Sequence, residues 1–187
     1  MLRIGVLVSG RGSNLEAVLR AGIEVALVIS NRPGVRALDV ASAHGVPSLA
    51  LRRADFADAA ARDAAIGQAL ADAGVTLCLL AGYDQVLRPT FFEAYGGRTI
   101  NVHPSLLPRH GGQGMMGLEV HRSVLASGDT ESGATIHEVT GDLDGGPILA
   151  QVRVPVLPGD DAGSLAARVL AEEHRLVVAT LAELLGE

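Results

Sequence analysis

An asparagine and a histidine two positions apart stand out among the polar residues of this chain. Asn101 and His103 end a short apolar run, and Pro104 follows directly. Residues two apart on an extended strand point to the same side, so these side chains share one face. An amide and a protonated imidazole stabilise the oxyanion that develops when a carbonyl carbon is attacked. A buried polar pair satisfied by the backbone is the alternative interpretation of an isolated Asn-x-His.

A glycine-rich turn supplies a candidate partner for the imidazole. Asp144 lies in the segment 141–147, which reads Gly-Asp-Leu-Asp-Gly-Gly-Pro, between two β-rich runs. A carboxylate beside an imidazole favours the protonated ring and fixes its orientation. The alternative is that Asp144 only shapes its turn by hydrogen bonding to nearby backbone.

A third motif, Gly-Arg-Gly-Ser-Asn at 10–14, follows the first apolar run. If a helix begins there, its unpaired N–H groups and partial positive charge favour phosphate binding. Ser13 and Asn14 can cap the helix or donate to phosphate oxygens. The motif lacks the third glycine of a dinucleotide fingerprint and the Gly-Lys-Ser/Thr of a P-loop. A capped turn without a ligand is the other interpretation.

The elements that must position these motifs alternate along the first half of the chain. Apolar runs predict strands at 2–8, 24–30, 47–51, 75–81 and 99–103. Helical spacing predicts helices at 14–21, 35–43, 56–73 and 89–95. This order predicts an α/β fold, a Rossmann-like parallel sheet with helices on both faces. Open sheets of this kind place their ligands at the strand ends, where the motifs fall.

The second half is less regular. Strands predicted at 134–139 and 148–156 flank the turn 141–147 and extend the sheet as antiparallel strands. Helices are predicted at 118–127 and 165–185. The glycine- and methionine-rich run 108–117 has no period, which predicts a flexible loop.

Composition narrows the function classes. The chain has 187 residues, 48% of them hydrophobic, and a formal net charge of −6, which disfavours general nucleic-acid binding. A single cysteine excludes an internal disulfide and suits a reducing compartment. No signal peptide is recognisable, and no apolar run approaches the roughly 20 residues of a membrane span. We expect a cytoplasmic protein with neither a nucleic-acid nor a membrane partner.

Other reactive side chains give weaker patterns. No two histidines have the i, i+4 spacing of a helical zinc motif, and one cysteine cannot complete a thiolate site, so we predict no metal. Ser13 and Ser105 lack the Gly-x-Ser-x-Gly setting of a serine hydrolase. We expect His44 and His110 to be exposed on loops.

Four segments together resemble the phosphoribosylglycinamide formyltransferases, folate-dependent enzymes of purine synthesis. They are Ser-Gly-Arg-Gly-Ser-Asn-Leu at 9–15, Leu-Ala-Gly-Tyr at 80–83, Asn-Val-His-Pro-Ser-Leu-Leu-Pro at 101–108 and Leu-Asp-Gly-Gly-Pro at 143–147. The last two are shared across folate formyltransferases, and Gly-Ser-Asn at 12–14 indicates the glycinamide ribonucleotide branch. The resemblance implies one formyltransferase domain over 1–187. Its phosphate-binding half is about 1–100, and its folate-binding and catalytic half is about 101–187.

The resemblance also implies a reaction and residue roles. A formyl group would pass from the co-substrate 10-formyltetrahydrofolate to the amine of glycinamide ribonucleotide, in a monomer or homodimer without a metal. Asn101 and His103 would stabilise the tetrahedral intermediate, and Asp144 would keep His103 protonated and assist proton transfer. Substrate contacts would come from Gly12, Ser13 and Asn14 at the phosphate and from Glu173. Folate contacts would come from Asp84, Gln85, Val86, Leu87, Asn101, Thr140, Gly141, Asp142 and Leu143.

The chain departs from the family pattern at three places. Tyr83-Asp84-Gln85 stands where the family has Met-Arg or a similar pair after Gly-Phe. Ala59 stands near a basic family position, with Arg62 or Arg53 as candidate replacements. The loop after Pro108 is longer than usual, and we interpret it as a mobile lid over the folate, with a floppy surface loop as the alternative.

Other functions fit the residues less well. Methionyl-tRNA formyltransferases carry an additional C-terminal domain, and formyltetrahydrofolate deformylases carry an additional N-terminal one; neither is expected here. A non-catalytic nucleotide-binding module would leave Asn101, His103 and Asp144 without a role. A nicotinamide oxidoreductase needs the third glycine of the fingerprint and an acidic residue about 20 positions later, and this sequence shows neither feature convincingly.

Overall fold

A computed structural model describes residues 2–186 and divides into two compact units. The first unit contains the described residues through Ile100 together with those from Leu184 onward. The second unit runs from Asn101 to Glu183.

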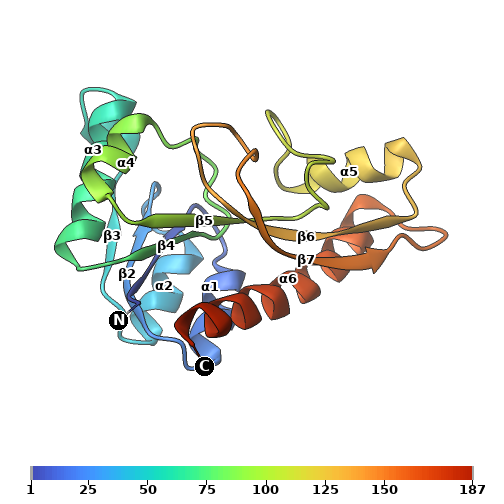
Figure 1. The fold of residues 1–187 in the computed structure, drawn as a ribbon, viewed down its shortest axis with the longest axis horizontal. Helices are drawn as coiled ribbons and strands as arrows, with labels where there is room; N and C mark the ends of the chain where they lie inside the picture. Colours follow the sequence, from blue (N-terminus) through green and yellow to red (C-terminus); the bar gives the residue numbers. More distant parts are fainter. Residues whose placement is uncertain (1, 187) are drawn as a thin grey trace. The chain divides into compact units, whose positions relative to one another are not determined.

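The first unit is built on parallel strands. They are β1 (Ile4–Val8), β2 (Val25–Ser30), β3 (Ser48–Ala50) and β4 (Leu77–Leu80), and β1 pairs with both β2 and β4 while β2 pairs with β3. The connecting helices are α1 (Ser13–Arg20), α2 (Arg36–Ala43), α3 (Ala59–Asp72) and α4 (Pro89–Tyr95), with a short 3₁₀ turn, η1 (Arg53–Asp55), before α3. In Figure 1, α1 and α2 lie on one side of these strands and α3 and α4 lie on the other.

The central strands of this unit are buried on both faces, as continuous apolar runs of a parallel sheet require. All residues of β1 and β4 are buried. Cys78 lies within β4, where burial raises the pKa of its thiol and so disfavours the reactive thiolate. This cysteine therefore serves as a small core residue.

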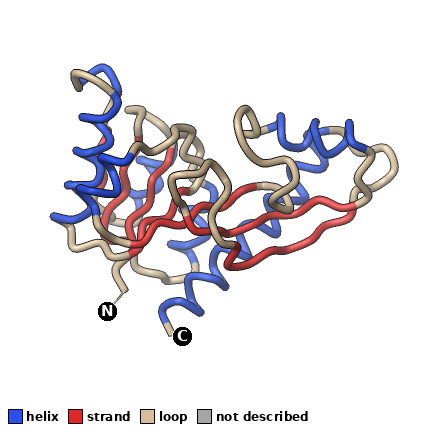
Figure 2. The backbone as a smooth tube through the Cα atoms, turned by 45° about the horizontal axis from the view of Figure 1, so that its top comes forward, coloured by secondary structure: helices blue, strands red, loops and turns tan. Residues whose placement is uncertain are grey.

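The second unit continues the sheet in antiparallel fashion. β5 (Arg98–His103) begins in the first unit and ends in the second, and β6 (Glu131–Glu138) pairs antiparallel with β7 (Ile148–Pro155). Figure 2 shows β6 and β7 as a long two-stranded ribbon. Helices α5 (Leu118–Ser127) and α6 (Ala162–Leu185) share a core with these strands, formed by Val124, Ala134, Val154, Leu165 and Val169.

The strand order is β3-β2-β1-β4-β5-β6-β7, which confirms the predicted Rossmann-like sheet with antiparallel extension. Several predicted boundaries were displaced, by up to three residues at the starts of α3, β6 and α6. Helix α3 begins at Ala59 because the Asp58 carboxylate accepts a hydrogen bond from the Ala61 N–H at 2.7 Å and caps the helix. Strand β6 begins at Glu131, earlier than predicted, and includes Gly133, where a Cβ would meet the Val152 carbonyl oxygen at 1.9 Å.

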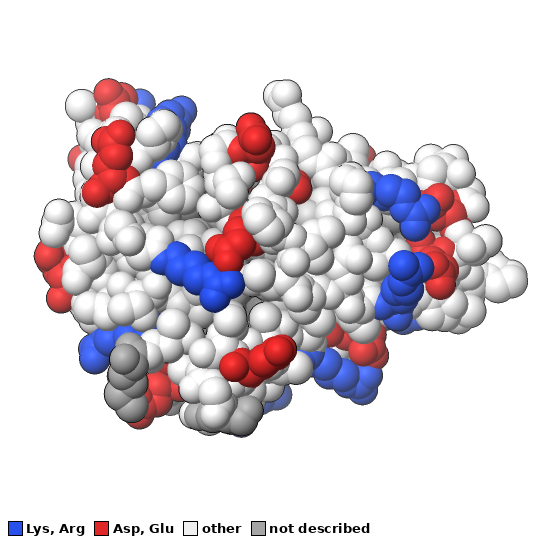
Figure 3. All heavy atoms as spheres, in the orientation of Figure 1, with Lys and Arg blue, Asp and Glu red and all other residues white. Residues whose placement is uncertain are grey.

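The surface of the described residues carries mixed charge. On the face drawn in Figure 3, arginine and acidic side chains lie interspersed. None of the helices within residues 2–186 is long and apolar enough to span a membrane.

Candidate active site

The carboxyl end of β5 and the turn between β6 and β7 bring the predicted catalytic residues together. His103 is 5% exposed, and its Nδ1 lies 3.8 Å from the Asp144 Oδ2 atom. Val102, between Asn101 and His103, is buried. Asp144 has a φ of 53°, in the left-handed region that non-glycine residues seldom adopt.

A second histidine, which the sequence reasoning missed, completes this cluster. The Nε2 atom of His137 lies 3.7 Å from Asp144 Oδ1 and 3.1 Å from Asn101 Nδ2. Its Nδ1 atom lies 2.9 Å from the carbonyl oxygen of Glu138. The Asp144 carboxylate is thus flanked by two imidazoles.

His137 fixes the orientation of the Asn101 amide. Burial is the largest cause of a lowered His137 pKa, so the ring is neutral near pH 7. Because Nδ1 donates to the Glu138 carbonyl, Nε2 must accept, and the Asn101 group that faces it is the amide NH₂. An NH₂ group carries two donors, so Asn101 can donate to His137 and to an oxyanion at once.

The pairing of β6 with β7 is irregular beside His137. Ile136 pairs with Ala150 and His137 pairs with Ile148, so the register shifts between them. Irregular pairing of this kind is frequent beside active sites. The alternation that pairs Asn101 with His103 also pairs Thr135 with His137 in the predicted strand 134–139, and this signal could have indicated the residue.

The segment that follows His103 is held by a buried hydroxyl. Thr135 Oγ1 donates to the Ser105 carbonyl at 2.6 Å and accepts from the Leu107 N–H at 3.1 Å. Gln151 Nε2 donates to the Leu107 carbonyl at 2.9 Å. These bonds tie the proline-flanked segment to β6 and β7, so the end of β5 is rigidly placed.

The glycine-rich loop after this segment touches the catalytic residues through its backbone. The His110 carbonyl accepts from His103 Nε2 at 2.9 Å, and the Gly112 N–H donates to Asp144 Oδ2 at 2.8 Å. Gly111 lies between them, and a Cβ there would lie 2.5 Å from Leu107 Cδ2, so Leu107 would have to shift. The loop predicted to be flexible, 108–117, thus contacts the catalytic residues through the backbone of 110 and 112. The expectation that His110 is exposed is wrong, because its side chain is 12% exposed and hydrogen bonded.

The first glycine motif forms the N-terminus of α1, in the first unit. Gly12 is the N-cap residue, with a φ of 71°, and no side chain caps the helix. Glu16, in the first turn, has its negative charge compensated by two arginines. Arg36 hydrogen bonds to it and lowers its pKa, and Arg20 Nη2 lies 2.6 Å from its Oε1 atom. A helix start of this kind suits an anion. The backbone also explains the glycine, because a Cβ at Gly12 would meet that of Ala37 at 2.6 Å.

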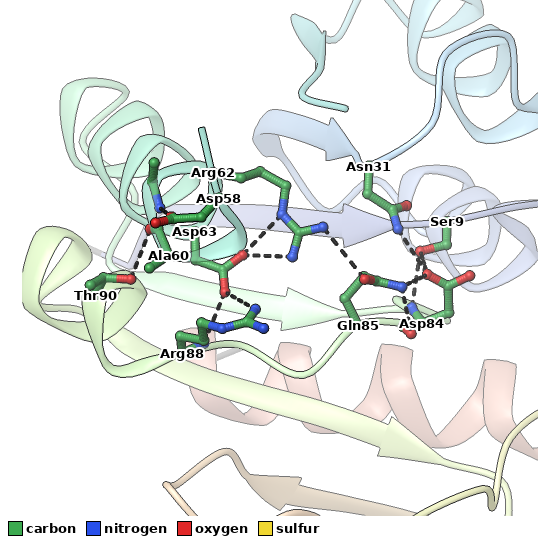
Figure 4. A network of polar contacts seen from close by, with 11 residues as sticks. Ser9, Asn31, Asp58, Ala60, Arg62, Asp63, Asp84, Gln85, Arg88 and Thr90 are labelled. Atoms are coloured by element: carbon green, nitrogen blue, oxygen red, sulfur yellow. Dashed lines mark hydrogen bonds and ion pairs between the residues drawn. The ribbon is translucent and has the colours of Figure 1, made fainter. Parts of the chain in front are cut away.

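The loop after β4 is anchored through the Asp84 side chain (Figure 4). Asp84 Oδ1 accepts from Ser9 Oγ at 3.0 Å and Asn31 Nδ2 at 2.8 Å, and Oδ2 pairs with Arg32. Burial opposes ionisation, but these hydrogen bonds and one from Gln85 outweigh it and lower the pKa of Asp84. The carboxylate therefore joins the ends of β1, β2 and β4. The Asp84 N–H donates to Ser9 Oγ, and Val86 is 59% exposed.

A buried ion pair holds the other end of that loop. Arg62 is 1% exposed and Asp63 is fully buried, with Arg62 Nη2 at 2.7 Å and Nε at 3.0 Å from Asp63 Oδ1. Asp63 Oδ2 accepts from the Arg88 N–H at 3.0 Å, as Figure 4 shows. Arg62 is thus enclosed and paired, which does not suit the ligand contact suggested for it. Arg53 is exposed, and its Nη1 donates to the Phe56 carbonyl at 2.9 Å.

The remaining expected contacts lie in the second unit. In the turn between β6 and β7, Thr140 Oγ1 accepts from the Asp142 N–H at 3.4 Å, and Leu143 is 48% exposed. Glu173 is buried in α6. Within residues 2–186, no group of three or more His, Cys, Asp or Glu side chains is arranged to hold a metal ion.

The fold and the cluster define a Rossmann-like α/β protein with an amide, an imidazole and a carboxylate at a strand end, an arrangement suited to acyl-group transfer. A family model described as formyl transferase matches residues 2–181. The chain therefore belongs to the formyl transferase family.

Individual relatives agree with this assignment. The chain is 43% identical to the trifunctional purine biosynthetic protein adenosine-3 of Drosophila melanogaster, over 92% of the chain, but it spans only 13% of that protein's length. It is 36% identical to the phosphoribosylglycinamide formyltransferase of Escherichia coli (strain K12), over 94% of the chain and 83% of the relative. The crystal structure of phosphoribosylglycinamide formyltransferase from Streptococcus pneumoniae TIGR4 superimposes with a TM-score of 0.91 at 33% identity, covering 99% of both chains.

Proposed function

We propose that the chain transfers the formyl group of 10-formyltetrahydrofolate to the amine of glycinamide ribonucleotide, N1-(5-phospho-D-ribosyl)glycinamide, in purine (IMP) synthesis. The observation that carries the proposal is the buried cluster of Asn101, His103 and Asp144 in a member of the formyl transferase family. The name of the Escherichia coli relative, which the chain matches over most of its length, supports the choice of acceptor.

The geometry supports direct attack through a tetrahedral intermediate. The substrate amine attacks the formyl carbon, and the carbonyl electron pair moves to oxygen. Asn101 donates to this oxyanion with the amide hydrogen that His137 does not use, and the imidazolium charge of His103 stabilises it. The bond from carbon to the folate nitrogen then breaks. That nitrogen gains a proton and the attacking amine loses one, with Asp144 as the relay.

The same proposal assigns the binding residues. The uncapped helix start at Gly12, Ser13 and Asn14 would hold the substrate phosphate, and Glu173 would contact the substrate. The folate would contact Asn101, the loop 84–87 and the turn 140–143, where Val86 and Leu143 expose apolar side chains. A match of one family model to 2–181 supports one formyltransferase domain over 1–187. We further propose a cytoplasmic monomer or homodimer that binds no nucleic acid.

One assay distinguishes the folate-dependent alternatives. The purified chain is given 10-formyltetrahydrofolate with glycinamide ribonucleotide, initiator methionyl-tRNA or water as acceptor, and release of tetrahydrofolate is followed. We expect turnover with the ribonucleotide alone. Equal release with water would indicate a deformylase, formylated tRNA would indicate the tRNA branch, and no release with any acceptor would refute the proposal.

A further inference from the structure

We propose that His110, Ser123 and Asp129 form a positioning group that holds the 110–112 backbone against the catalytic residues. The inference rests on the proposed function. The side chains of these three residues contact neither His103 nor Asp144. Only the backbone of the 110–112 segment touches those two residues.

The His110 ring is fixed at both nitrogens. Its Nδ1 lies 2.8 Å from Ser123 Oγ on α5, and its Nε2 lies 2.9 Å from Asp129 Oδ2, beyond the end of that helix. The hydrogen bond from His110 is the largest cause of a lowered Asp129 pKa, so the acceptor is a carboxylate. Arg109 also binds this carboxylate, with Nη1 at 3.1 Å from Oδ2. A ring held at two ends cannot rotate without losing both bonds.

The fixed ring determines where the His110 backbone points. His110 has a φ of 54°, a conformation that non-glycine residues seldom adopt and that surrounding contacts must maintain. In this conformation its carbonyl oxygen lies 2.9 Å from His103 Nε2 and 3.3 Å from Ser105 Oγ. Two residues later, the Gly112 N–H donates to Asp144 Oδ2 at 2.8 Å. The loop therefore supplies one acceptor to the catalytic imidazole and one donor to its carboxylate partner.

These contacts fix the orientation of the His103 ring. Its Nε2 carries the hydrogen that it donates to the His110 carbonyl at 2.9 Å, and its Nδ1 faces Asp144 Oδ2 at 3.8 Å. The ring thus has an oxygen atom on each side. If the His110 side chain were released, the carbonyl could turn away and His103 would lose one of its two orienting partners.

Side-chain variants test the positioning role. His110→Asn retains a residue that tolerates the left-handed conformation but is too short to reach both Ser123 and Asp129. Ser123→Ala removes one anchor and favours the helix, so α5 is retained. We expect each to lower kcat about tenfold or more while the KM values of both substrates change by less than about twofold, because the binding residues lie elsewhere. Asp129→Asn, which keeps an acceptor oxygen, should retain more activity than Asp129→Ala.

Arg109→Gln is the matched control. It removes another partner of Asp129 but leaves the His110 contacts, so kcat should stay near that of the unchanged protein. Wild-type kcat in both His110→Asn and Ser123→Ala would overturn the inference, as would an equal loss in Arg109→Gln.

A second measurement does not depend on turnover. The ¹⁵N chemical shifts of the His103 ring report which nitrogens are protonated, and we expect the Nε2 signal to move in His110→Asn and to stay in Arg109→Gln. Unchanged ring signals in His110→Asn would refute the positioning role, even if the enzyme transferred the formyl group to a different substrate. Absent formyl transfer in the unchanged protein, with the expected shifts in His110→Asn, would refute only the proposed function.

Discussion

Removing the carboxylate of Asp63 should destabilise the chain more than removing any exposed acidic side chain. Arg62 and Asp63 are 1% and 0% exposed, and two hydrogen bonds of 2.7 and 3.0 Å join them. Asp63→Ala leaves a guanidinium in the interior without its counter-charge. Breaking a buried pair in this way costs about 3–5 kcal/mol. For a chain of this size, each kcal/mol moves Tm by about 2–4 °C, so Tm should fall by roughly 6–20 °C.

The exposed pair of Arg52 and Asp55 is a matched control. It is also joined by two hydrogen bonds, of 2.9 and 2.6 Å, but its side chains are 54% and 39% exposed. Asp55→Ala should therefore leave Tm almost unchanged, because water solvates the remaining arginine. The double variant Arg62→Met with Asp63→Ala should recover part of the loss, since no unpaired charge remains.

Thermal unfolding followed by circular dichroism compares these variants. Equal Tm values for Asp63→Ala and Asp55→Ala would refute the argument from burial. A double variant less stable than Asp63→Ala would show that the cost comes from lost packing and not from the unpaired charge. A functional readout accompanies the shift: Asp63 also accepts from the Arg88 N–H, so its loss should raise the KM for the folate.

Three further predictions address the site. Asp144→Asn should fold and lose about a hundredfold or more in kcat, because His103 loses its anionic partner; near-normal turnover would refute the relay role. Ser13→Ala with Asn14→Ala should raise the KM for the ribonucleotide about tenfold and leave the KM for the folate unchanged; an unchanged ribonucleotide KM would move the phosphate site elsewhere. Burial lowers the pKa of His137 from its ordinary 6.5, so the unfolded chain binds the proton that the folded chain excludes. Stability should fall as the pH drops below about 6.5, by at most about 1.4 kcal/mol per pH unit from this group. Urea midpoints should show a weaker pH dependence in His137→Gln, whereas a control at the exposed His44 should keep the full dependence.

Local periodicity predicted the sheet and placed two of the site residues. Alternation along 99–103 is a property of a single strand, so it identified Asn101 and His103 as neighbours without knowledge of the fold. The meeting of Asp144 with His103 depends on the hairpin of β6 and β7, and spacing alone left it open. The alternation along 134–139 could have placed His137 on the same face as Thr135, but its contacts with Asp144 and Asn101 join three separate segments of the chain.

Arg62 shows a different reason why a residue's role could not be predicted from the sequence. It lies four residues before Ile66 and eight before Leu70, on the buried stripe of α3. Helical spacing therefore places it inside, but a charged residue is expected to face water unless a partner is known. The partner, Asp63, is adjacent in the chain, and the third contact, the Arg88 N–H, comes from 25 residues away. Only the folded chain shows that this pair is satisfied.

The loop 109–117 could not be interpreted from residue types because its contribution to the site is made by backbone atoms. The catalytic imidazole and carboxylate require a carbonyl and an N–H at fixed places, and many side chains could accompany them. What the sequence must specify is the conformation that delivers those atoms. Here that task falls to Gly111, which leaves room for the approach, and to His110, whose ring is anchored on α5 and at Asp129. The conformation of this loop thus depends on residues that do not touch the reacting atoms. A sequence without helical or strand periodicity is what such a loop should have.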